Sequence, residues 1–174
     1  MKKFNLVKVL SLILVVAALG CVMCGCGRAK MNVKVGIKLG QDYIDYMYEK
    51  NADNEEFIIP NEDRNLLNDI DVEIVYKDGE QVSALTAFIE ATYLQAIEYT
   101  LDSAEQSVKS VKTYGEFSGS AADGTNLFFF WTYTINGVEP TTGRAATNYV
   151  KDGDVIVFTL TSASENDFKE EDMK

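Results

Sequence analysis

The side chains best suited to recognition chemistry in this chain are aromatic and amide groups near the carboxyl end. The segment 128–133 reads Phe-Phe-Phe-Trp-Thr-Tyr, and Asn136 and Tyr149 follow it. Tryptophan and tyrosine rings combine a broad apolar face with a polar edge, so they stack on flat ligands and also form hydrogen bonds. We therefore take Trp131, Tyr133, Asn136 and Tyr149 as candidate ligand-binding residues. Their chemistry is stacking and hydrogen bonding, with no bond broken.

The residues needed for common catalytic sites are missing or have no clear arrangement. The chain contains no histidine, which excludes Ser-His-Asp and Cys-His nucleophilic sites and His-containing zinc motifs. Carboxylate pairs are frequent, but 27 Asp and Glu residues produce such pairs by chance. The segment 51–56 is similar to a calcium loop, yet it has no glycine at its sixth position, so a solvated acidic loop is favoured. We expect no enzyme, no cofactor and no metal site.

The first residues have the pattern of a targeting segment. Three lysines lie within the first eight residues, and the fifteen-residue stretch 9–23 is apolar. A membrane-spanning helix needs about 20 apolar residues, so this run is short. Cys21, Cys24 and Cys26 lie at its end among small residues, as in a bacterial lipoprotein signal. We expect acylation at Cys26, with Cys21 as the alternative; the opposing interpretation is an uncleaved anchor helix with incidental cysteines.

This interpretation places the mature protein on the extracytoplasmic face of the bacterial cell membrane, held by acyl chains such as palmitate. Residues 1–25 are then a signal peptide and residues 26–31 a lipid-anchored tether. The formal net charge is −11, and removal of residues 1–25, with three lysines and no acid, makes it −14. So acidic a chain is repelled by nucleic acid. With the cysteines used for lipid, no disulfide is expected.

The remaining residues predict one mixed domain. Residues 32–39 and 71–77 alternate apolar and polar side chains as half-buried strands do. Ser83 can cap a helix that begins near Ala84. The apolar stripe expected on that helix comprises Leu85, Phe88, Ile89, Tyr93, Ala96 and Ile97.

Further strands are predicted over 108–117, 127–135 and 155–161, the first more weakly. Asn136-Gly137 and Asp152-Gly153 tolerate positive φ and predict tight turns beside them. Residues 40–70 form a long insertion after the first strand, with a helical turn or two over 41–50. Residues 162–174 are polar and are expected to fray.

The strand 127–135 has two faces with different side chains. Leu127, Phe129, Trp131, Tyr133 and Ile135 share one face, whereas two phenylalanines and two threonines share the other. One face must cover the helix. Two interpretations follow: all the aromatic rings are core, or one row forms an exposed platform with Asn136 and Tyr149.

The residues of the last two strands also carry a family resemblance. The matching positions are Phe130, Trp131, Tyr133, Asn136, Gly137, Tyr149, Lys151, Asp152, Gly153, Asp154 and Ile156. Together they resemble the C-terminal domain of the transcobalamin-like family, a β-grasp module of bacterial surface lipoproteins, and the match covers 71–161 well. The resemblance implies an α+β, ubiquitin-like fold over 32–161, with a mixed sheet curled round one main helix.

The resemblance further implies cobalamin or another corrinoid as the ligand. In that family the module closes over one side of cobalamin while a separate α-helical barrel holds the other, and the connection 143–149 corresponds to a loop near the corrin. This chain has no barrel domain, and its connection is longer. The first hypothesis is therefore a surface lipoprotein that captures a small ligand, for hand-off to a transporter. The alternative is a protein-interaction or adhesion module, binding a surface protein through a strand edge and the insertion.

Overall fold

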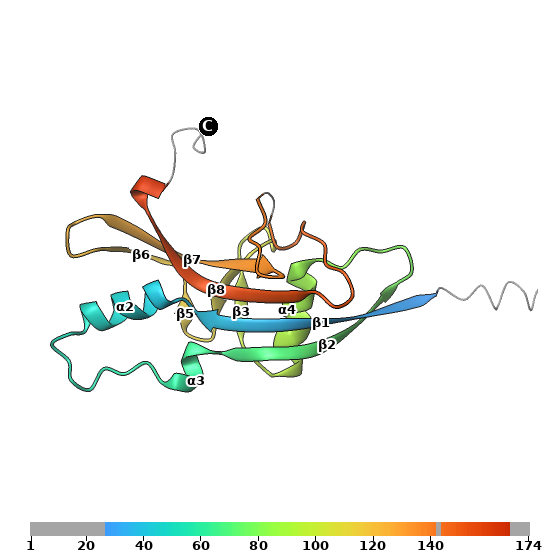
Figure 1. Cartoon of the computed structure of the whole chain (residues 1–174), viewed down its shortest axis with the longest axis horizontal. Coiled ribbons are helices and arrows are strands. Elements are labelled where there is room, and N and C mark those ends of the chain that lie inside the picture. The colour runs from blue at the N-terminus through green and yellow to red at the C-terminus, as the bar shows by residue number, and fades with distance from the viewer. Residues whose placement is uncertain (1–26, 142–143, 168–174) are drawn as a thin grey trace, which may run out of the picture.

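A computed structural model describes residues 27–141 and 144–167, which form an α+β fold with a mixed sheet (Figure 1). The main sheet has five strands in the order β2-β1-β8-β7-β6. Their bounds are β1 (Arg28–Leu39), β2 (Leu67–Lys77), β6 (Phe117–Ser120), β7 (Asn126–Ile135) and β8 (Val155–Ser164). β1 and β8 pair in parallel at the centre, and every other pairing is antiparallel. The first and last long strands of the domain are therefore neighbours.

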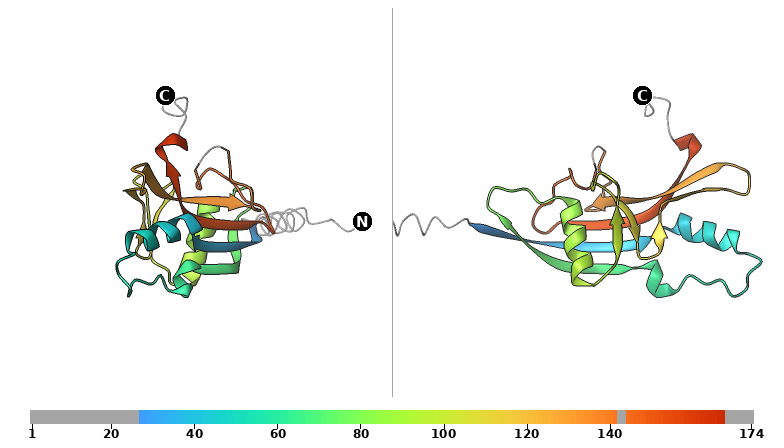
Figure 2. Two further views of the ribbon diagram at one scale, coloured as in Figure 1. Left: turned by 60° about the vertical axis from the view of Figure 1, so that its left-hand side comes forward. Right: turned by 180° about the vertical axis from the view of Figure 1, so that it is seen from behind.

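One face of this sheet is the core. The alternating residues of β1 are buried as predicted, with Val33, Val35, Ile37 and Leu39 at most 4% exposed. They share their face with Ile156, Phe158 and Leu160 of β8, because the two strands are in register. Helix α4 (Ala84–Leu94) lies across this face (Figure 2), and the ring of Phe88 packs on Phe158.

A second, smaller sheet covers the rest of that face. It comprises β3 (Tyr99–Leu101), β4 (Val108–Val111) and β5 (Tyr114–Gly115). The single strand expected over 108–117 is wrong, because the chain turns between β4 and β5. Lys112 adopts a φ of 49°, which an extended strand does not allow. The chain then joins the main sheet as β6.

The start of α4 confirms the predicted cap. The Ser83 hydroxyl oxygen accepts a 3.1 Å hydrogen bond from the amide of Thr86, which satisfies one free N–H of the first turn. The predicted apolar stripe is only partly right. Leu85 and Phe88 are buried, whereas Tyr93 is 80% exposed and Ala96 follows the helix in a left-handed conformation. Alanines complete the buried face, because small side chains let the helix approach the sheet closely.

Both ends of the domain reach further than the sequence suggested. The segment 28–31 belongs to β1, pairs with β2 and buries Met31, so it is not a tether. At the other end, β8 continues through Ser164, and a short 3₁₀ turn, η1 (Glu165–Asp167), follows. Residues 168–174 lie outside the described residues.

The insertion forms two helices at the end of the molecule opposite the start of β1 (Figures 1 and 2). They are α2 (Gln41–Lys50) and α3 (Asn61–Arg64), and β2 begins already at Leu67. α2 is longer than the turn or two expected and buries Tyr43 and Ile44. Among the described residues, no helix is both long and apolar enough to span a bilayer.

Candidate functional site: a cavity beside Trp131

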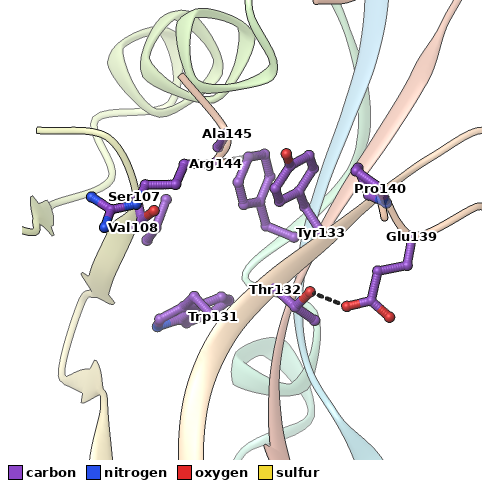
Figure 3. Close-up of a pocket in the computed structure, with 10 residues that line it drawn as sticks. Ser107, Val108, Trp131, Thr132, Tyr133, Glu139, Pro140, Arg144 and Ala145 are labelled. Carbon is purple, nitrogen blue, oxygen red and sulfur yellow. Dashed lines mark hydrogen bonds between the residues drawn. The ribbon is translucent and has the colours of Figure 1, made fainter. Parts of the chain in front are cut away.

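A cavity of about 200 Å³ lies between β7, the start of β4 and the connection from β7 to β8 (Figure 3). Its apolar lining includes Val108, Trp131, Tyr133, Ala145 and Phe158. Trp131 and Tyr133 are two residues apart, so they project from the same face of β7 into this space. The alternation of the strand thus brings two of the four candidate binding residues together.

Trp131 is a wall of the cavity and not an exposed platform. It is 7% exposed, and its Nε1–H donates a 3.1 Å hydrogen bond to the carbonyl oxygen of Tyr114. The row that contains Phe129, Trp131 and Tyr133 faces the core. The interpretation that this row of aromatic rings forms an exposed platform is therefore wrong, because α4 and the second sheet cover this face.

Tyr133 brings a polar group into the cavity. Its ring stacks on Phe158 at 5.3 Å between centroids and 24° between planes. Its hydroxyl oxygen is buried and has no hydrogen-bond partner among the described residues. Burial raises the pKa of Tyr133, and the nearby Asn148 side chain opposes that rise without reaching bonding geometry. A buried hydroxyl without a partner is costly, so one hydrogen-bonding position in the cavity is open to a water, to the nearby Asn148 amide or to a ligand.

Polar side chains line the rim of the cavity. Thr132 points to the side of β7 away from Trp131, and its hydroxyl donates a 2.7 Å hydrogen bond to Glu139 (Figure 3). Across the cavity, Arg144 Nη1 lies 3.1 Å from Gln106 Oε1 and 3.4 Å from Asp102 Oδ2. The first bond ties β7 to the connection that follows it. The other two tie Arg144 to the loop between β3 and β4.

Asp102 organises the loop that holds Arg144. Its carboxylate accepts a 2.8 Å hydrogen bond from the amide of Gln106. That bond chiefly, with the charge of Arg144 as a smaller contribution, keeps the pKa of Asp102 below its ordinary value. The ionised form therefore persists into acid, and the rim keeps its geometry.

The structure places the other two candidates outside the cavity. Asn136 has a φ of 53°; its Nδ2 donates to Asp154 Oδ1 at 2.8 Å, and its Oδ1 accepts from the amide of Val155 at 2.9 Å. Its side chain thus joins two turns. Tyr149 is 52% exposed and forms an isolated bridge with Ser83.

The insertion contacts the side chain of Tyr114, whose backbone carbonyl bonds to Trp131 in the cavity wall. The Tyr114 hydroxyl donates a 3.1 Å hydrogen bond to Asp63 Oδ2 of α3, and Lys112 Nζ lies 3.1 Å from Asp63 Oδ1. Burial first, then the hydrogen bond and negative charge of Asp63, raise the pKa of Tyr114 from 10.0 to about 12. Because Trp131 bonds to the same residue, the insertion and the cavity wall are linked through Tyr114.

Rings from α2 hold the other side of the insertion on the sheet. Tyr43 meets Phe129 edge-on at 5.8 Å, and Tyr46 contacts the same ring at 4.7 Å. Phe129 in turn stacks on Phe117 at 4.5 Å. The insertion is therefore packed against β6 and β7, and β7 is the strand that carries Trp131.

Several lining residues were not predicted from the sequence. Arg144 had a usable signal, because it is the sole basic residue between Lys112 and Lys151 in an acidic chain. Val108 and Phe158 had none, because their place at the cavity depends on how distant strands pack. No group of three or more metal-ligating side chains is present within the described ranges, and residues 52–56 are exposed. All three cysteines lie outside the described residues.

No protein-family model matches the chain, and no curated protein is similar enough to it to count as a match. The arguments that follow therefore depend on this chain's own residues.

Proposed function

We propose that this protein is a lipid-anchored, extracytoplasmic β-grasp module that binds a small ligand in the cavity beside Trp131. A corrinoid is the first ligand to test, because the motif in the last two strands resembles the transcobalamin-like C-terminal domain. The ligand would be captured at the surface and passed to a transporter. Its binding would need stacking and hydrogen bonds, with no catalytic step.

The strand arrangement supports the β-grasp assignment. A parallel pair, β1 and β8, occupies the centre of the main sheet, with β2 and β7 antiparallel on either side. One helix, α4, crosses the covered face. This is the arrangement expected when a mixed sheet wraps one main helix. The second sheet and the insertion are additions to that plan.

The observation that carries the ligand-binding proposal is the hydroxyl of Tyr133. It is buried in a cavity wall and has no partner among the described residues. Proteins pair nearly all such groups, and exceptions mark functional positions or bound water. A ligand that accepts or donates one hydrogen bond here would satisfy the group, while Trp131 and Phe158 provide apolar contact.

The size of the cavity limits how a corrinoid would bind. About 200 Å³ is less than the 300–1,000 Å³ of pockets for drug-sized ligands. A macrocycle would therefore lie across the rim, with one peripheral group entering beside Tyr133. Only one side of it would be covered, so tight binding would need a partner protein for the other side.

Calorimetric titration with cyanocobalamin tests this function. We expect saturable heat with the unaltered protein and about fivefold weaker binding by Tyr133→Phe, the loss of one hydrogen bond. Tyr149→Phe is the matched control, because Tyr149 lies outside the cavity, and it should bind as the unaltered protein does. Absence of heat at high micromolar ligand would count against a corrinoid.

A second function is favoured by the exposed apolar residue of the insertion. Ile58 is 69% exposed within an acidic segment, so it would be a contact point if the insertion binds another protein. In this alternative the insertion binds a surface protein or an adhesion partner. A photoreactive residue at position 58 should then cross-link to one discrete partner on intact cells, and the same residue at position 93 should not. Equal, diffuse labelling from both positions would exclude it.

A further inference from the structure

The fixed part of the fold begins beside the cysteine proposed to carry the lipid. Arg28 pairs with Lys77 across β1 and β2, and the amide of Asp78 donates a 2.8 Å hydrogen bond to the carbonyl oxygen of Gly27. Cys26 is therefore two residues from a strand that is paired with β2 from its first residue. Each residue spans at most about 3.6 Å, so an acylated Cys26 holds Arg28 within roughly 7 Å of the lipid attachment.

The surface around that point is balanced in charge and partly apolar. Its exposed basic side chains are Arg28, Lys30 and Lys77, and its acidic ones are Glu73, Asp78 and Glu80. Lys30 and Glu73 form a 2.8 Å ion pair. Val75, which pairs with Lys30 across β1 and β2, is 48% exposed. We call this surface the base.

The opposite end of the molecule is strongly acidic. Residues 41–66 carry eight carboxylates and two basic side chains. The carboxylates are Asp42, Asp45, Glu49, Asp53, Glu55, Glu56, Glu62 and Asp63. Most of them are exposed. Residues 41–66 therefore carry a net charge of −6, whereas the three positive and three negative charges of the base cancel.

The whole length of β1 separates the two ends. β1 has twelve residues, which at about 3.3 Å per residue span roughly 40 Å. α2 continues beyond the far end of β1 (Figures 1 and 2). This separation is several times the Debye length of about 8 Å in physiological salt. The electrostatic force of an anionic bilayer is therefore much stronger on the end of the domain that contacts it than on the opposite end.

We propose that the domain stands on the bilayer with its base against the lipid headgroups and residues 41–66 of the insertion outermost. This orientation depends on the proposed lipid anchor at Cys26. The short link keeps the base at the membrane, and charge repulsion keeps the insertion away from it. Val75 and the half-buried Tyr76, on opposite faces of β2, then lie at the level of the interface, where the amphipathic ring of Tyr76 is stable.

Fluorescence quenching on vesicles tests the orientation. The acylated full-length product, with Cys21 and Cys24 replaced by serine, carries a dye at Lys77→Cys or at Asp53→Cys. It is placed in phosphatidylglycerol-containing vesicles whose headgroups bear a nitroxide quencher. The dye at position 77 should be quenched several-fold more than the dye at position 53. Equal quenching, or stronger quenching at position 53, would overturn the proposal.

Two controls separate this proposal from the anchoring on which it depends. Twenty Gly/Ser residues inserted after Cys26 should abolish the difference between the dyes, and a difference that persists would contradict the role of the short link. Intact mass of the unaltered chain identifies the acylated residue. Acylation at Cys21 would overturn the orientation and leave the anchor, whereas an unacylated chain that stays off vesicles would overturn both.

Discussion

The indole N–H of Trp131 donates a 3.1 Å hydrogen bond to the carbonyl oxygen of Tyr114. The hydroxyl of the same tyrosine is bonded to Asp63 in α3. One residue of the second sheet therefore touches both a wall of the cavity and the insertion. This relationship gives the insertion a structural role close to the cavity, whatever else it contacts.

Tyr114→Phe should lower the free energy of unfolding by about 1–2 kcal/mol, because it removes a hydrogen bond to a carboxylate. The backbone carbonyl that receives the Trp131 hydrogen bond remains in this variant. Urea denaturation followed by circular dichroism measures the change. Tyr93→Phe is the control, since Tyr93 is 80% exposed and should change stability by less than about 0.5 kcal/mol. Equal effects of the two substitutions would show that the contact with α3 is unimportant.

The attachment of α2 should depend on pH through Asp42. Asp42 Oδ2 accepts hydrogen bonds from Thr161 Oγ1 at 2.8 Å and from the Ser162 hydroxyl at 2.7 Å and amide. Burial alone would raise the pKa of Asp42, but these bonds outweigh it and lower the pKa below 3.8. The stabilisation is therefore present above the unfolded-state pKa and is lost as pH falls through the folded-state value.

Asp42→Asn should accordingly cost about 2 kcal/mol at pH 7, where the carboxylate is ionised, and progressively less as the pH falls below 3.8. Urea denaturation at a series of pH values gives the comparison. Asp53→Asn, in the exposed loop, should show no such trend. A constant deficit for Asp42→Asn across the series would contradict the pKa assignment.

Asn136 should prove to be a turn residue and not a ligand contact. Asn136→Ala loses two hydrogen bonds and places a methyl group at a φ of 53°, so a loss of about 2 kcal/mol is expected. Asn136→Gly loses the same bonds without the strain and should be less destabilising. Cyanocobalamin affinity, measured by calorimetry on the folded variants, should be unchanged; a selective loss of affinity would restore the binding role.

Tyr133→Phe should have the opposite effect on stability from Tyr114→Phe. The Tyr133 hydroxyl has no partner to lose among the described residues, so its removal should be neutral or stabilise the fold by up to about 1 kcal/mol. Thermal and urea denaturation of the ligand-free protein provide the measurement. A loss above about 1 kcal/mol would mean that the hydroxyl is already bonded in the free protein, for example to an ordered water.

Much of the fold was predictable because its signals are local. Alternation in 32–39 predicted the buried face of β1, Ser83 predicted the cap of α4, and the Asn-Gly and Asp-Gly pairs predicted the turns beside β7 and β8. The exposure of Trp131 was not predictable in this way. Alternation shows which side chains share a face, but not which face a second sheet covers.

The predictions that the structure contradicts share a physical cause, which is that they depend on contacts between distant segments or on backbone angles without a local signal. The strand expected over 108–117 breaks at Lys112, whose positive φ has no signal in the sequence. Helical spacing predicts Tyr93 in the buried stripe, yet α4 buries its alanines instead. The cavity itself forms between β4, β7 and the connection to β8, so its lining depends on contacts between distant segments.

The chemical shift of the Trp131 indole N–H during titration with cyanocobalamin tests the central claim most directly. Trp131 is the sole tryptophan, so one cross-peak in a ¹⁵N-correlated spectrum reports on the cavity wall. We predict a saturable shift of this peak in the unaltered protein, and a shift that requires about fivefold more ligand in Tyr133→Phe. A peak that stays in place while peaks of the insertion move would contradict binding in the cavity.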